Sequence, residues 1–213
     1  MTMIEVLDHG YVRLVDRMGD LKRVADAARV SHNNDGPVNP RNPGLIKYLR
    51  DHQHTSPFEH VIFTFEVKAP IFVFRQWQRH RTWSFNEMSG RYVEMEEEFY
   101  VPPADKIGTQ CSTNHQARDM GGHNQFTTSI LNSIDMQSEV AFGEYHYLLG
   151  LGCPREVARM ILPLNTYSRM YATVDLHNLI HFVRLREAPD AQWEIQEYAR
   201  AIRQLVPELG ELL

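Results

Sequence analysis

The sequence predicts a mixed α+β fold: one domain over residues 1–213, with a mixed or antiparallel sheet and flanking helices. A chain of 213 residues is long enough for a single domain with a sizeable core. Segments typical of strands and of helices are interspersed, without the regular βαβ units of a doubly wound sheet. Hydrophobic residues make up 43% and charged residues 23% of the chain, as in an ordinary globular protein.

In the N-terminal third of the chain, over 3–70, the sequence predicts strands at both ends and two helices between them. In order, these elements are a strand pair over 3–17, a helix over 21–32, a loop over 33–44, a helix over 44–52 and a strand over 60–70. The strand pair turns at His9 and Gly10, and Asp20 caps the first helix. Asn42 and Pro43 suit the cap and first turn of the second helix. The last strand is β-branched and aromatic, and it ends at Pro70.

The remaining elements are mostly helical. They are a short helix over 71–80 with Pro70 in its first turn, a loop over 79–91, an extended segment over 91–103, a mobile or poorly ordered surface loop over 104–123, a long helix over 125–149, a helix over 155–162, a strand over 164–174, a helix over 176–188 and a last helix over 191–205. Pro154 starts one helix, Pro163 ends it and Asp175 caps the next. The predicted inner side of the long helix consists of Ile130, Ile134, Met136, Val140, Phe142 and Tyr145.

Charge and cysteine usage exclude several classes of protein. The net charge is −5 and the pI is about 6.1, so no global basic field is available to hold a nucleic acid. Two cysteines, Cys111 and Cys153, cannot form a disulfide framework, which favours a reducing cytoplasm. Glu5 and Asp8 interrupt the N-terminal apolar run, which argues against a signal peptide. No stretch reaches the roughly 20 apolar residues that span a bilayer.

The stretch over 79–91, RHRTWSFNEMSGR, is the most informative polar segment, and the apolar run IFVFRQWQ leads directly into it. Guanidinium forks match phosphate oxygens, and serine–glycine turns offer backbone N–H groups to the same oxygens. Surface ion pairs, worth about 0–1 kcal/mol each, are the plainer interpretation. Glu87 would repel a phosphate unless it pairs with an arginine, but it could accept from a sugar hydroxyl. The stretch therefore predicts a site for a phosphorylated small molecule, a nucleotide rather than bare phosphate.

The segment DHQHTSPFEH, over 51–60, is rich in histidine. Ser56, Pro57 and Glu59 have the spacing of a capping box with proline at the first helical position, which favours a structural role. A metal site is the functional alternative, but the spacing of His52, His54 and His60 matches no diagnostic ligand pattern.

Two helical segments carry further polar groups. His177, His181 and Arg184 fall on one helix face, where two histidines at i and i+4 can chelate zinc or can simply face solvent. Asn178 stands where a zinc protease helix has its catalytic glutamate, so we predict no metal. In CPREVARM, over 153–160, Arg155 and Arg159 share the first turns of a helix, where anions are favoured. Nothing places a base near Cys153, and we expect no covalent nucleophile.

The stretch RHRTWSFNEMSGR resembles the signature of the flavin-dependent thymidylate synthases, R-H-R-x-x-S-x-N-x-x-S-x-R. All seven specified positions match: Arg79, His80, Arg81, Ser84, Asn86, Ser89 and Arg91. Four further segments are similar to the family, namely RQWQ, the His54/Ser56/Glu59 group, PREVARMILPLNTYSR, and the ending HFVRLR with AQWEIQEYA. The resemblance covers most of the chain except residues 104–123.

The resemblance implies an enzyme that methylates dUMP to dTMP, without a cysteine nucleophile. It implies 5,10-methylenetetrahydrofolate as carbon donor, FAD as carrier and NADPH as reductant. Such a cofactor carries the difficult chemistry, and the protein orients it and tunes its charge. The resemblance also implies a homotetramer whose active sites are shared between subunits.

The resemblance further implies two sets of site residues. The implied dUMP contacts are Gln76, Arg79, Glu87, Ser89, Gly90, Arg91, Arg159 and Arg186. The implied FAD contacts are Ser31, His54, Ser56, Glu59, Arg79, His80, Arg81, Asn86, Glu87, Asp175, His177 and His181. Arg186 is the implied catalytic residue, because a cation beside uracil favours loss of its N3 proton and makes C5 a better nucleophile. One departure concerns FAD: this chain has Asp175-Leu176-His177 where one form of the family has Asn-x-Arg, and His181 replaces an asparagine.

Two other functions remain open at the level of sequence. A nucleotide- or RNA-binding module could use the arginines of 79–91 on phosphates, which predicts strong salt dependence and no bound chromophore. A metal-dependent hydrolase could use the histidines, which predicts inhibition by chelators.

Overall fold

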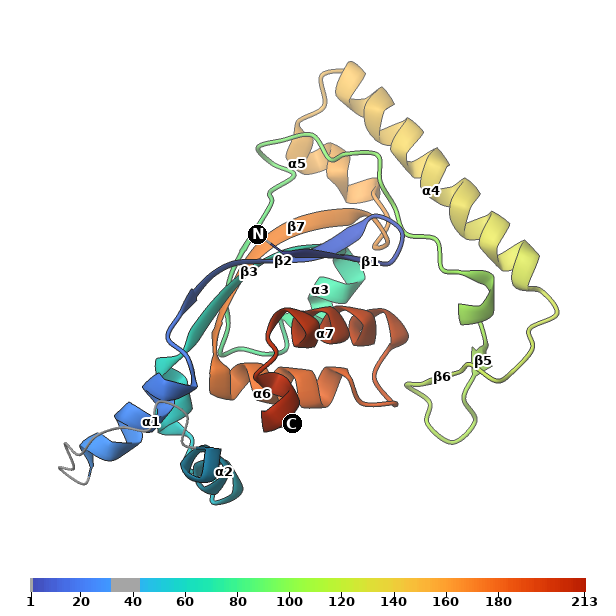
Figure 1. Ribbon diagram of the computed structural model, residues 1–213. Helices are drawn as coiled ribbons and strands as arrows, with labels where there is room; N and C mark the ends of the chain where they lie inside the picture. The colour runs from blue at the N-terminus through green and yellow to red at the C-terminus, as the bar shows by residue number, and fades with distance from the viewer. Residues whose placement is uncertain (1, 32–42) are drawn as a thin grey trace.

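The computed structural model describes residues 2–31 and 43–213 and is built around a five-stranded antiparallel sheet (Figure 1). The strand order is β1-β2-β3-β7-β4, and each neighbouring pair is antiparallel. The strands are β1 (Met3–Val6), β2 (Gly10–Met18), β3 (Ile62–Pro70), β4 (Ser84–Glu87) and β7 (Tyr167–Asp175). A separate small hairpin pairs β5 (Thr109–Gln110) with β6 (Arg118–Asp119).

Helices flank the sheet. They are α1 (Leu21–Val30), α2 (Pro43–Asp51), α3 (Ile71–Trp77), α4 (Thr127–Gly150), α5 (Arg155–Ala158), α6 (Leu176–Arg186), α7 (Trp193–Leu205) and α8 (Leu209–Leu212), with 3-10 turns η1 (Ser56–His60), η2 (Ala104–Lys106) and η3 (Arg159–Ile161). α7 packs on β1, β2, α3 and α6, whereas α4 stands beside α5, away from α6 and α7 (Figure 1). The predicted α+β class, with an antiparallel sheet and flanking helices, is confirmed.

The core lies between the sheet and the pair α6–α7. Along β3, alternate side chains point into it, and Phe63, Phe65 and Val67 are buried. The helices contribute residues at helical spacing, including Leu179 on α6 and Ile195 on α7. Because protein interiors are densely packed, these contacts hold the ends of α3 and α6 in fixed positions.

Most predicted elements form where the local signals place them. Asp20 caps α1 by accepting from the backbone N–H of Arg23 at 3.1 Å. Asp175 caps α6 by accepting from the backbone N–H of Asn178 at 2.9 Å. Such side-chain caps satisfy otherwise unpaired N–H groups at the start of a helix. Residues 33–42 of the predicted loop over 33–44, and with them the cap at Asn42, lie outside the described residues, whereas Pro43 and Gly44 belong to α2, with Pro43 in its first turn as predicted.

The prediction that 79–91 is a loop is wrong for its centre, where β4 pairs with β7. Ser84 is opposite Thr173, and Glu87 is opposite Met170. The four residues alternate between exposed and half-buried, which is the period of a strand. The segment is too short and too polar to show that period in the sequence, and the free edge of β7 provides its hydrogen-bonding partner.

Two predicted helix starts are also wrong. η1 is a 3-10 turn whose N-cap is Thr55, without a side-chain capping bond, so Ser56 and Glu59 form no capping box. Pro70 ends β3 and precedes α3 as its N-cap, rather than lying in the first turn. The helix predicted over 155–162 is α only to Ala158 and then tightens into η3. Short turns of this kind hold few of the bonds that stabilise longer helices.

The predicted inner side of α4 is correct only in part. Phe142 and Tyr145 are fully buried, whereas Met136 and Val140 are each 53% exposed. The long helix touches the rest of the chain mainly near its C-terminal half, where Phe142 and Tyr145 pack with Met95 and Ala158. The predicted periodicity is real, but much of the apolar surface of α4 is left uncovered by the residues that the structure describes.

The segment over 104–123, predicted to be a mobile or poorly ordered loop, has regular structure. It contains η2 and the β5–β6 hairpin, in which Thr109 is opposite Asp119. Arg118 forms an ion pair with Glu194 at the start of α7. This long-range contact was not visible in a sequence without periodicity.

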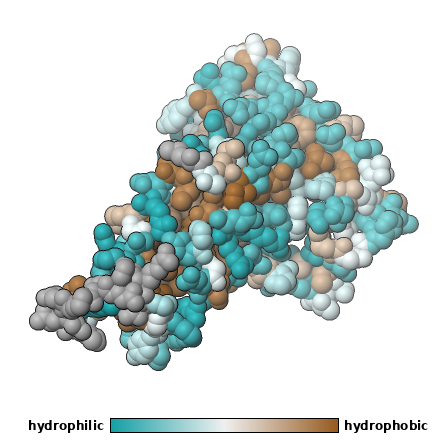
Figure 2. All heavy atoms as spheres, viewed as in Figure 1, coloured by the Kyte–Doolittle hydropathy of each residue, from teal (hydrophilic) through white to brown (hydrophobic). Residues whose placement is uncertain are grey.

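Hydrophobic side chains on one face of the molecule gather in a band across its middle and are surrounded by hydrophilic residues (Figure 2). Within residues 2–31 and 43–213, no helix combines the length and apolarity needed to cross a membrane.

Gly10 is required by the close approach of three chain segments at the start of β2. A Cβ atom there would lie 2.6 Å from the Val6 carbonyl oxygen and 2.8 Å from that of Lys68, and would also meet the Tyr198 hydroxyl. We expect Gly10→Ala to lower the free energy of unfolding by about 1–3 kcal/mol, as overpacked sites do. Urea denaturation at one protein concentration measures this. Gly210→Ala is the matched control, because an added Cβ there meets no atom of the described residues within 4 Å beyond its own helix backbone. Equal effects of the two substitutions would contradict the steric argument.

Candidate functional site

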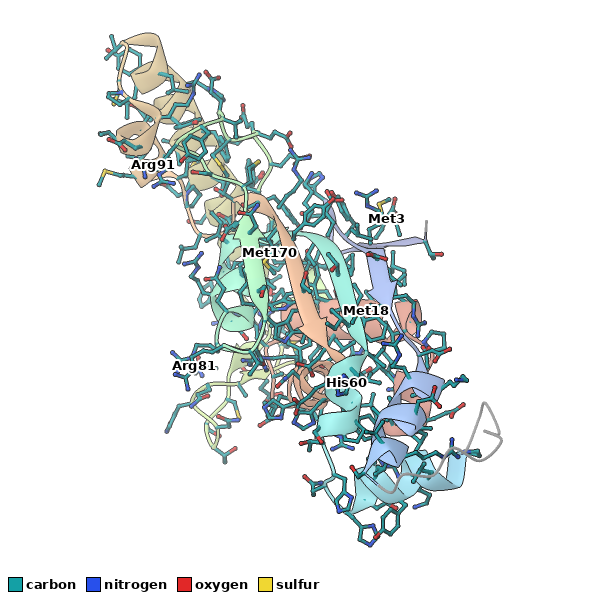
Figure 3. The ribbon with its side chains drawn as sticks, turned by 90° about the vertical axis from the view of Figure 1, so that its left-hand side faces the viewer. Met3, Met18, His60, Arg81, Arg91 and Met170 are labelled. Carbon is teal, nitrogen blue, oxygen red and sulfur yellow. The ribbon has the colours of Figure 1, made fainter. Side chains whose placement is uncertain are left out.

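The predicted site residues form two clusters beyond opposite ends of β4, and a pocket adjoins one of them. We call the first the Arg186 cluster; it consists of Gln76, Arg79, His80 and Arg186. The second, the Arg91 cluster, consists of Ser89, Gly90, Arg91 and Arg159. Figure 3 places Arg81 near one end of β4 and Arg91 beside α5 at the other, with Met170 of β7 between them.

The Arg186 cluster is held together by the guanidinium of Arg186, the last residue of α6. Its Nε donates to His80 Nε2 at 2.9 Å, and its Nη2 donates to the Gln76 carbonyl oxygen at 3.1 Å. His80 follows the end of α3, and its ring packs against Phe182 at a centroid distance of 4.9 Å. Both acceptors are neutral, and Arg186 has no carboxylate partner in the part of the chain that the structure describes. The cluster therefore keeps a positive charge that an anionic ligand could balance.

Burial controls the protonation of this cluster. His80 is 8% exposed, and burial, with Arg186 and His181 nearby, lowers its pKa from 6.5 to about 4. The imidazole is therefore neutral near pH 7, so its Nε2 can accept the Arg186 hydrogen bond. Burial, and then the neighbouring charge of Arg79, also lower the pKa of Arg186. Proximity to Arg79 places two cations at one end of the cluster.

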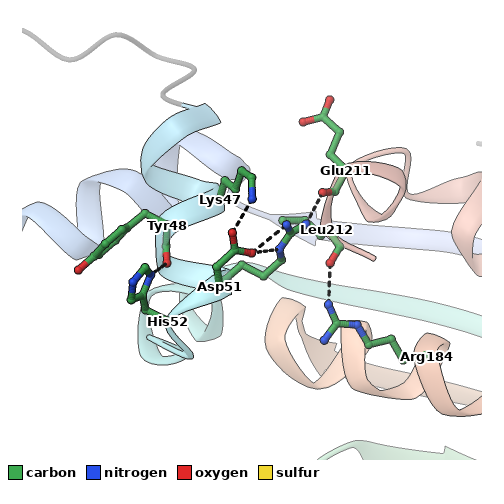
Figure 4. Close-up of polar contacts among 8 residues, drawn as sticks. Lys47, Tyr48, Asp51, His52, Arg184, Glu211 and Leu212 are labelled. Atoms are coloured by element: carbon green, nitrogen blue, oxygen red, sulfur yellow. Dashed lines mark hydrogen bonds and ion pairs between the residues drawn. The ribbon is translucent and has the colours of Figure 1, made fainter.

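A small hollow of about 130 Å³, the His177 pocket, lies close to the Arg186 cluster. Its lining includes three predicted FAD contacts, His54, His177 and His181. His181 links it to the Arg186 cluster, because its ring meets that of His80 edge-on at 5.9 Å. Arg50 and Arg184 also line the pocket and donate to the carbonyl oxygens of the C-terminal residues Glu211 and Leu212, at 2.8 and 3.1 Å (Figure 4).

The Arg91 cluster combines a tight turn with two arginines. The Ser89 carbonyl oxygen accepts from the backbone N–H of Tyr92 at 3.0 Å, and the Ser89 hydroxyl accepts from that of Arg91 at 3.3 Å. Gly90 is buried against the Arg159 side chain, since a Cβ added there would lie 3.2 Å from Arg159 Cδ. Arg91 is 56% exposed at its side chain and pairs loosely with Glu156 at 3.2 Å. A turn with adjacent exposed guanidiniums can bind a phosphate.

Glu87 lies between the two clusters, on β4. Its carboxylate accepts from Arg75 at 3.3 Å and from Gln78 at 3.2 Å, so an arginine does balance it as the sequence required. Asn86, its neighbour on β4, is exposed on the opposite side of the strand. In the described part of the chain, no hydrogen bond or ion pair joins the Arg91 cluster directly to the Arg186 cluster.

Other predicted FAD contacts are less closely grouped. Ser31 is exposed at the C-cap of α1, and Ser56 and Glu59 are exposed on η1. Arg81 is exposed beyond α3. The Asp175 carboxylate is already engaged as the cap of α6 and accepts from the Asn178 side chain at 2.6 Å as well.

Sequence reasoning missed Gln192 and Glu194. Gln76 donates to Gln192, and Gln192 donates to Glu194 at 2.8 Å. Glu194 lies one helical turn before the buried Tyr198, so helical periodicity could have placed it on the inner face of α7. Among the described residues, no three or more histidine, cysteine, aspartate or glutamate side chains are grouped to hold a metal ion.

Comparison with known proteins identifies close relatives. Residues 13–209 match the family model described as thymidylate synthase complementing protein. The flavin-dependent thymidylate synthase of Thermus thermophilus is 51% identical over 205 residues, which are 96% of this chain and 74% of the relative. That of Thermotoga neapolitana is 45% identical, over 96% of this chain and 89% of the relative.

Two solved structures share the fold of this chain. The crystal structure of the UMP/dUMP methylase PolB from Streptomyces cacaoi, bound with 5-Br dUMP, superposes with a TM-score of 0.84 at 38% identity. The match covers 97% of this chain and 93% of that chain. A second structure of PolB, bound with 5-Br UMP, also has a TM-score of 0.84, at 40% identity.

His80 predicts a pH dependence of stability. The folded protein keeps His80 neutral down to about pH 4, whereas the unfolded chain protonates it below about pH 6.5. Unfolding therefore takes up a proton between these values, and stability falls as the pH is lowered, by at most about 1.4 kcal/mol per pH unit from this group. The measurement is urea denaturation at pH 7 and pH 5.

The comparison variant for this prediction is His80→Asn, which keeps an acceptor for Arg186 but cannot titrate. We expect the wild type to lose more stability between pH 7 and pH 5 than the variant does. An equal loss in both proteins would contradict the assigned pKa.

Proposed function

The chain belongs to the thymidylate synthase complementing protein family, and we propose that it is a flavin-dependent thymidylate synthase, an enzyme that methylates dUMP to dTMP. The observation that carries the proposal is the family match over residues 13–209. The curated relatives of 45–51% identity, which share this name, support it. The proposed co-substrates are 5,10-methylenetetrahydrofolate as carbon donor and NADPH as reductant.

We propose FAD as the flavin. The His177 pocket and the adjoining Arg186 cluster offer imidazole and guanidinium donors, which suit a cofactor with a diphosphate. A hollow of about 130 Å³ can take only part of such a molecule, so the remainder would lie against exposed groups such as Arg81. When bound, the flavin supplies the methylene transfer and the redox chemistry.

In this proposal, Arg186 acts on the uracil ring. His80 and the Gln76 carbonyl hold two of its five N–H groups and so fix the plane of the guanidinium. A cation with neutral partners stabilises an anion beside it, which favours loss of the N3 proton of uracil. The resulting charge makes C5 a stronger nucleophile. Neutral His80 contributes by orienting Arg186 without cancelling its charge.

The Arg91 cluster is proposed to hold the phosphate of dUMP. The Ser89 hydroxyl accepts from the backbone N–H of Arg91, so its own proton is left to donate to a phosphate oxygen, and Arg91 and Arg159 supply two cations next to the turn. Ser89 is thus a binding hydroxyl and not a nucleophile. Glu87, already balanced by Arg75, would accept from the sugar.

A homotetramer with shared sites would reconcile the two clusters. β4 alone separates them by about 10–13 Å, at roughly 3.3 Å per residue. The exposed arginines extend beyond either end, so one chain presents two partial sites. We propose that the Arg186 cluster of one subunit faces the Arg91 cluster of another across a single dUMP molecule.

An apolar stripe on α4 supports such an assembly. It runs along one face of the helix at i, i+4, i+7, i+11 and i+15 and consists of Met136, Val140, Gly143, Tyr147 and Leu151. Four of the five residues are 53–65% exposed, and in the described part of the chain no atom outside the helix backbone lies within 4 Å of a Cβ added at Gly143. An apolar helix face of this length is stable when another surface covers it, and a second copy is the proposed partner.

The structural neighbour favours one further substrate. PolB is described as acting on both UMP and dUMP. UMP is therefore a second candidate, and the reaction should be measured with both nucleotides at equal concentration.

The proposed activity predicts a yellow protein that forms dTMP. Purified protein supplied with FAD should show a flavin absorption band that NADPH bleaches, and it should convert labelled dUMP to dTMP when the folate is added. Failure to bind FAD, or methylation of UMP alone, would contradict the proposal.

Arg186→Ala should lower kcat for dTMP formation by about 10²–10³, as loss of a preorganised electrostatic group does. The fold should survive, because Arg186 lies at the end of α6. Arg203→Ala, which removes an exposed arginine paired with Glu187, is the matched control and should leave turnover unchanged. Retained turnover in the Arg186 variant would refute its role.

Shared sites predict complementation between inactive subunits. Arg91→Ala and Arg186→Ala remove one cluster each, so each homo-oligomer should be inactive. Oligomers reassembled from a mixture of the two should regain part of the wild-type rate, because some sites then pair two intact clusters. Mixtures that stay inactive while exchanging subunits would contradict shared sites.

A further inference from the structure

Glu194, a buried carboxylate in the first turn of α7, has a network of donors around it. It is 1% exposed. Arg118 Nη2 donates to both of its oxygens, at 2.8 and 3.0 Å, and the Tyr100 hydroxyl donates at 3.3 Å. Gln192 Nε2 donates to Oε2 at 2.8 Å. Charged side chains are buried only where partners compensate them, and here the compensation is complete.

This network reaches the Arg186 cluster through two amides. Gln192 Oε1 accepts from Gln76 Nε2, and Gln192 Nε2 donates to Glu194. The backbone carbonyl of the same Gln76 accepts from Arg186. The Glu194 carboxylate is thus joined through Gln192 to the side chain of one proposed dUMP contact.

The carboxylate of Glu194 determines which group donates and which accepts at each step of this chain of hydrogen bonds. An ionised carboxylate only accepts, so Gln192 must turn its NH₂ group toward Glu194 and its carbonyl toward Gln76. Gln76 must in turn present its NH₂ group to Gln192, which leaves its own Oε1 as an acceptor with no hydrogen-bond donor among the described residues. A neutral residue in place of Glu194 would allow both amides to flip.

We propose that Glu194 is a positioning residue for nucleotide binding: through Gln192 it orients the Gln76 side chain so that its carbonyl oxygen meets a donor group of the nucleotide, an N–H or a hydroxyl. This inference rests on the proposed function, which places dUMP at Gln76. It assigns a role to a residue that touches neither substrate nor cofactor.

The β5–β6 hairpin region supports Glu194 from the outside. Arg118 of β6 donates to the Lys106 carbonyl as well as to Glu194, and the Lys106 ammonium lies 5.3 Å from the centre of the Trp193 ring. Figure 1 shows the hairpin beside the connection from α6 to α7. The segment over 104–123 thus fixes the start of α7, from which Gln192 and Glu194 extend.

A hollow of about 600 Å³ between this segment and α7 offers a competing explanation, a separate ligand site. Most of the amides that line it, although not that of Gln116, are already engaged within the chain. Gln110 Nε2 donates to the His115 carbonyl at 2.9 Å, and Gln196 Nε2 donates to that of Ala191 at 2.7 Å. With these donors committed, the arrangement favours support of α7 over recognition of a ligand.

Two single variants test the chain of hydrogen bonds from Glu194 through Gln192 to Gln76. Gln192→Leu removes the link and leaves the Arg118–Glu194 ion pair intact, which protects the fold. Glu194→Gln keeps the size and shape of the side chain, but an amide can both donate and accept, so it no longer fixes the orientations of the Gln192 and Gln76 amides. We expect each to raise both the KM and the dissociation constant for dUMP about three- to tenfold, as expected for one misdirected hydrogen bond, with a smaller change in kcat. FAD content should match that of the wild type.

A double variant separates the effect of amide orientation at Gln76 from the effect of losing the Arg118–Glu194 ion pair. In Gln192→Glu/Glu194→Gln the carboxylate sits next to Gln76 and again only accepts, so Gln76 keeps its orientation while the ion pair with Arg118 is lost. We expect the dUMP dissociation constant to return close to the wild-type value. Gln196→Leu, one turn along the same helix, is the matched control and should leave that constant unchanged.

Dialysis of labelled dUMP against the FAD-loaded protein, together with dTMP kinetics, gives all of these values. Wild-type affinity in Gln192→Leu would overturn the inference, and so would a double variant as weak as Glu194→Gln. A wild-type protein that binds no dUMP would instead refute the proposed function, so the two failures are distinguishable.

Discussion

The pairing of β4 with β7 is the constraint on which the geometry of the site depends. β4 is the edge strand of the sheet, and the polar stretch over 79–91 runs through it. Because a strand is straight and rigid, the residues before it and after it are held apart. Arg79 and His80 are directed toward α6, and Gly90 and Arg91 toward α5 and η3. A flexible loop, as the sequence predicted, could have folded both ends onto one ligand.

Neutral partners around Arg186 define the chemistry at one end. His80 has a lowered pKa because it is buried beside a cation, and a neutral imidazole can accept from that cation. Within the described residues, the hydrogen-bond partners of Arg186 are both neutral, and neither is a carboxylate. A positive charge held in this way is suited to an anion that forms during a reaction, and the proposed uracil anion is one. At the other end, Arg91 and Arg159 are exposed and suited to a phosphate.

Local signals allowed most of the fold to be predicted from sequence. Asp20 and Asp175 cap helices through residues three positions away, and β3 and β7 carry the residue types of buried strands. The contacts that build the site were not predictable in this way. His80 and Arg186 are 106 positions apart, and Arg118 and Glu194 are 76 apart. Such pairs leave no periodic pattern in the sequence. The motif over 79–91 could therefore indicate which residues belong to the site, but not that a single chain separates them into two clusters.

The most direct test of the separation into an Arg186 cluster and an Arg91 cluster is a crystal structure of the assembled protein with FAD and dUMP bound. We predict that each dUMP molecule lies between two chains, with its phosphate on Arg91 and Arg159 of one chain and its uracil on Gln76 and Arg186 of another. A dUMP molecule held at both ends by the same chain would contradict it.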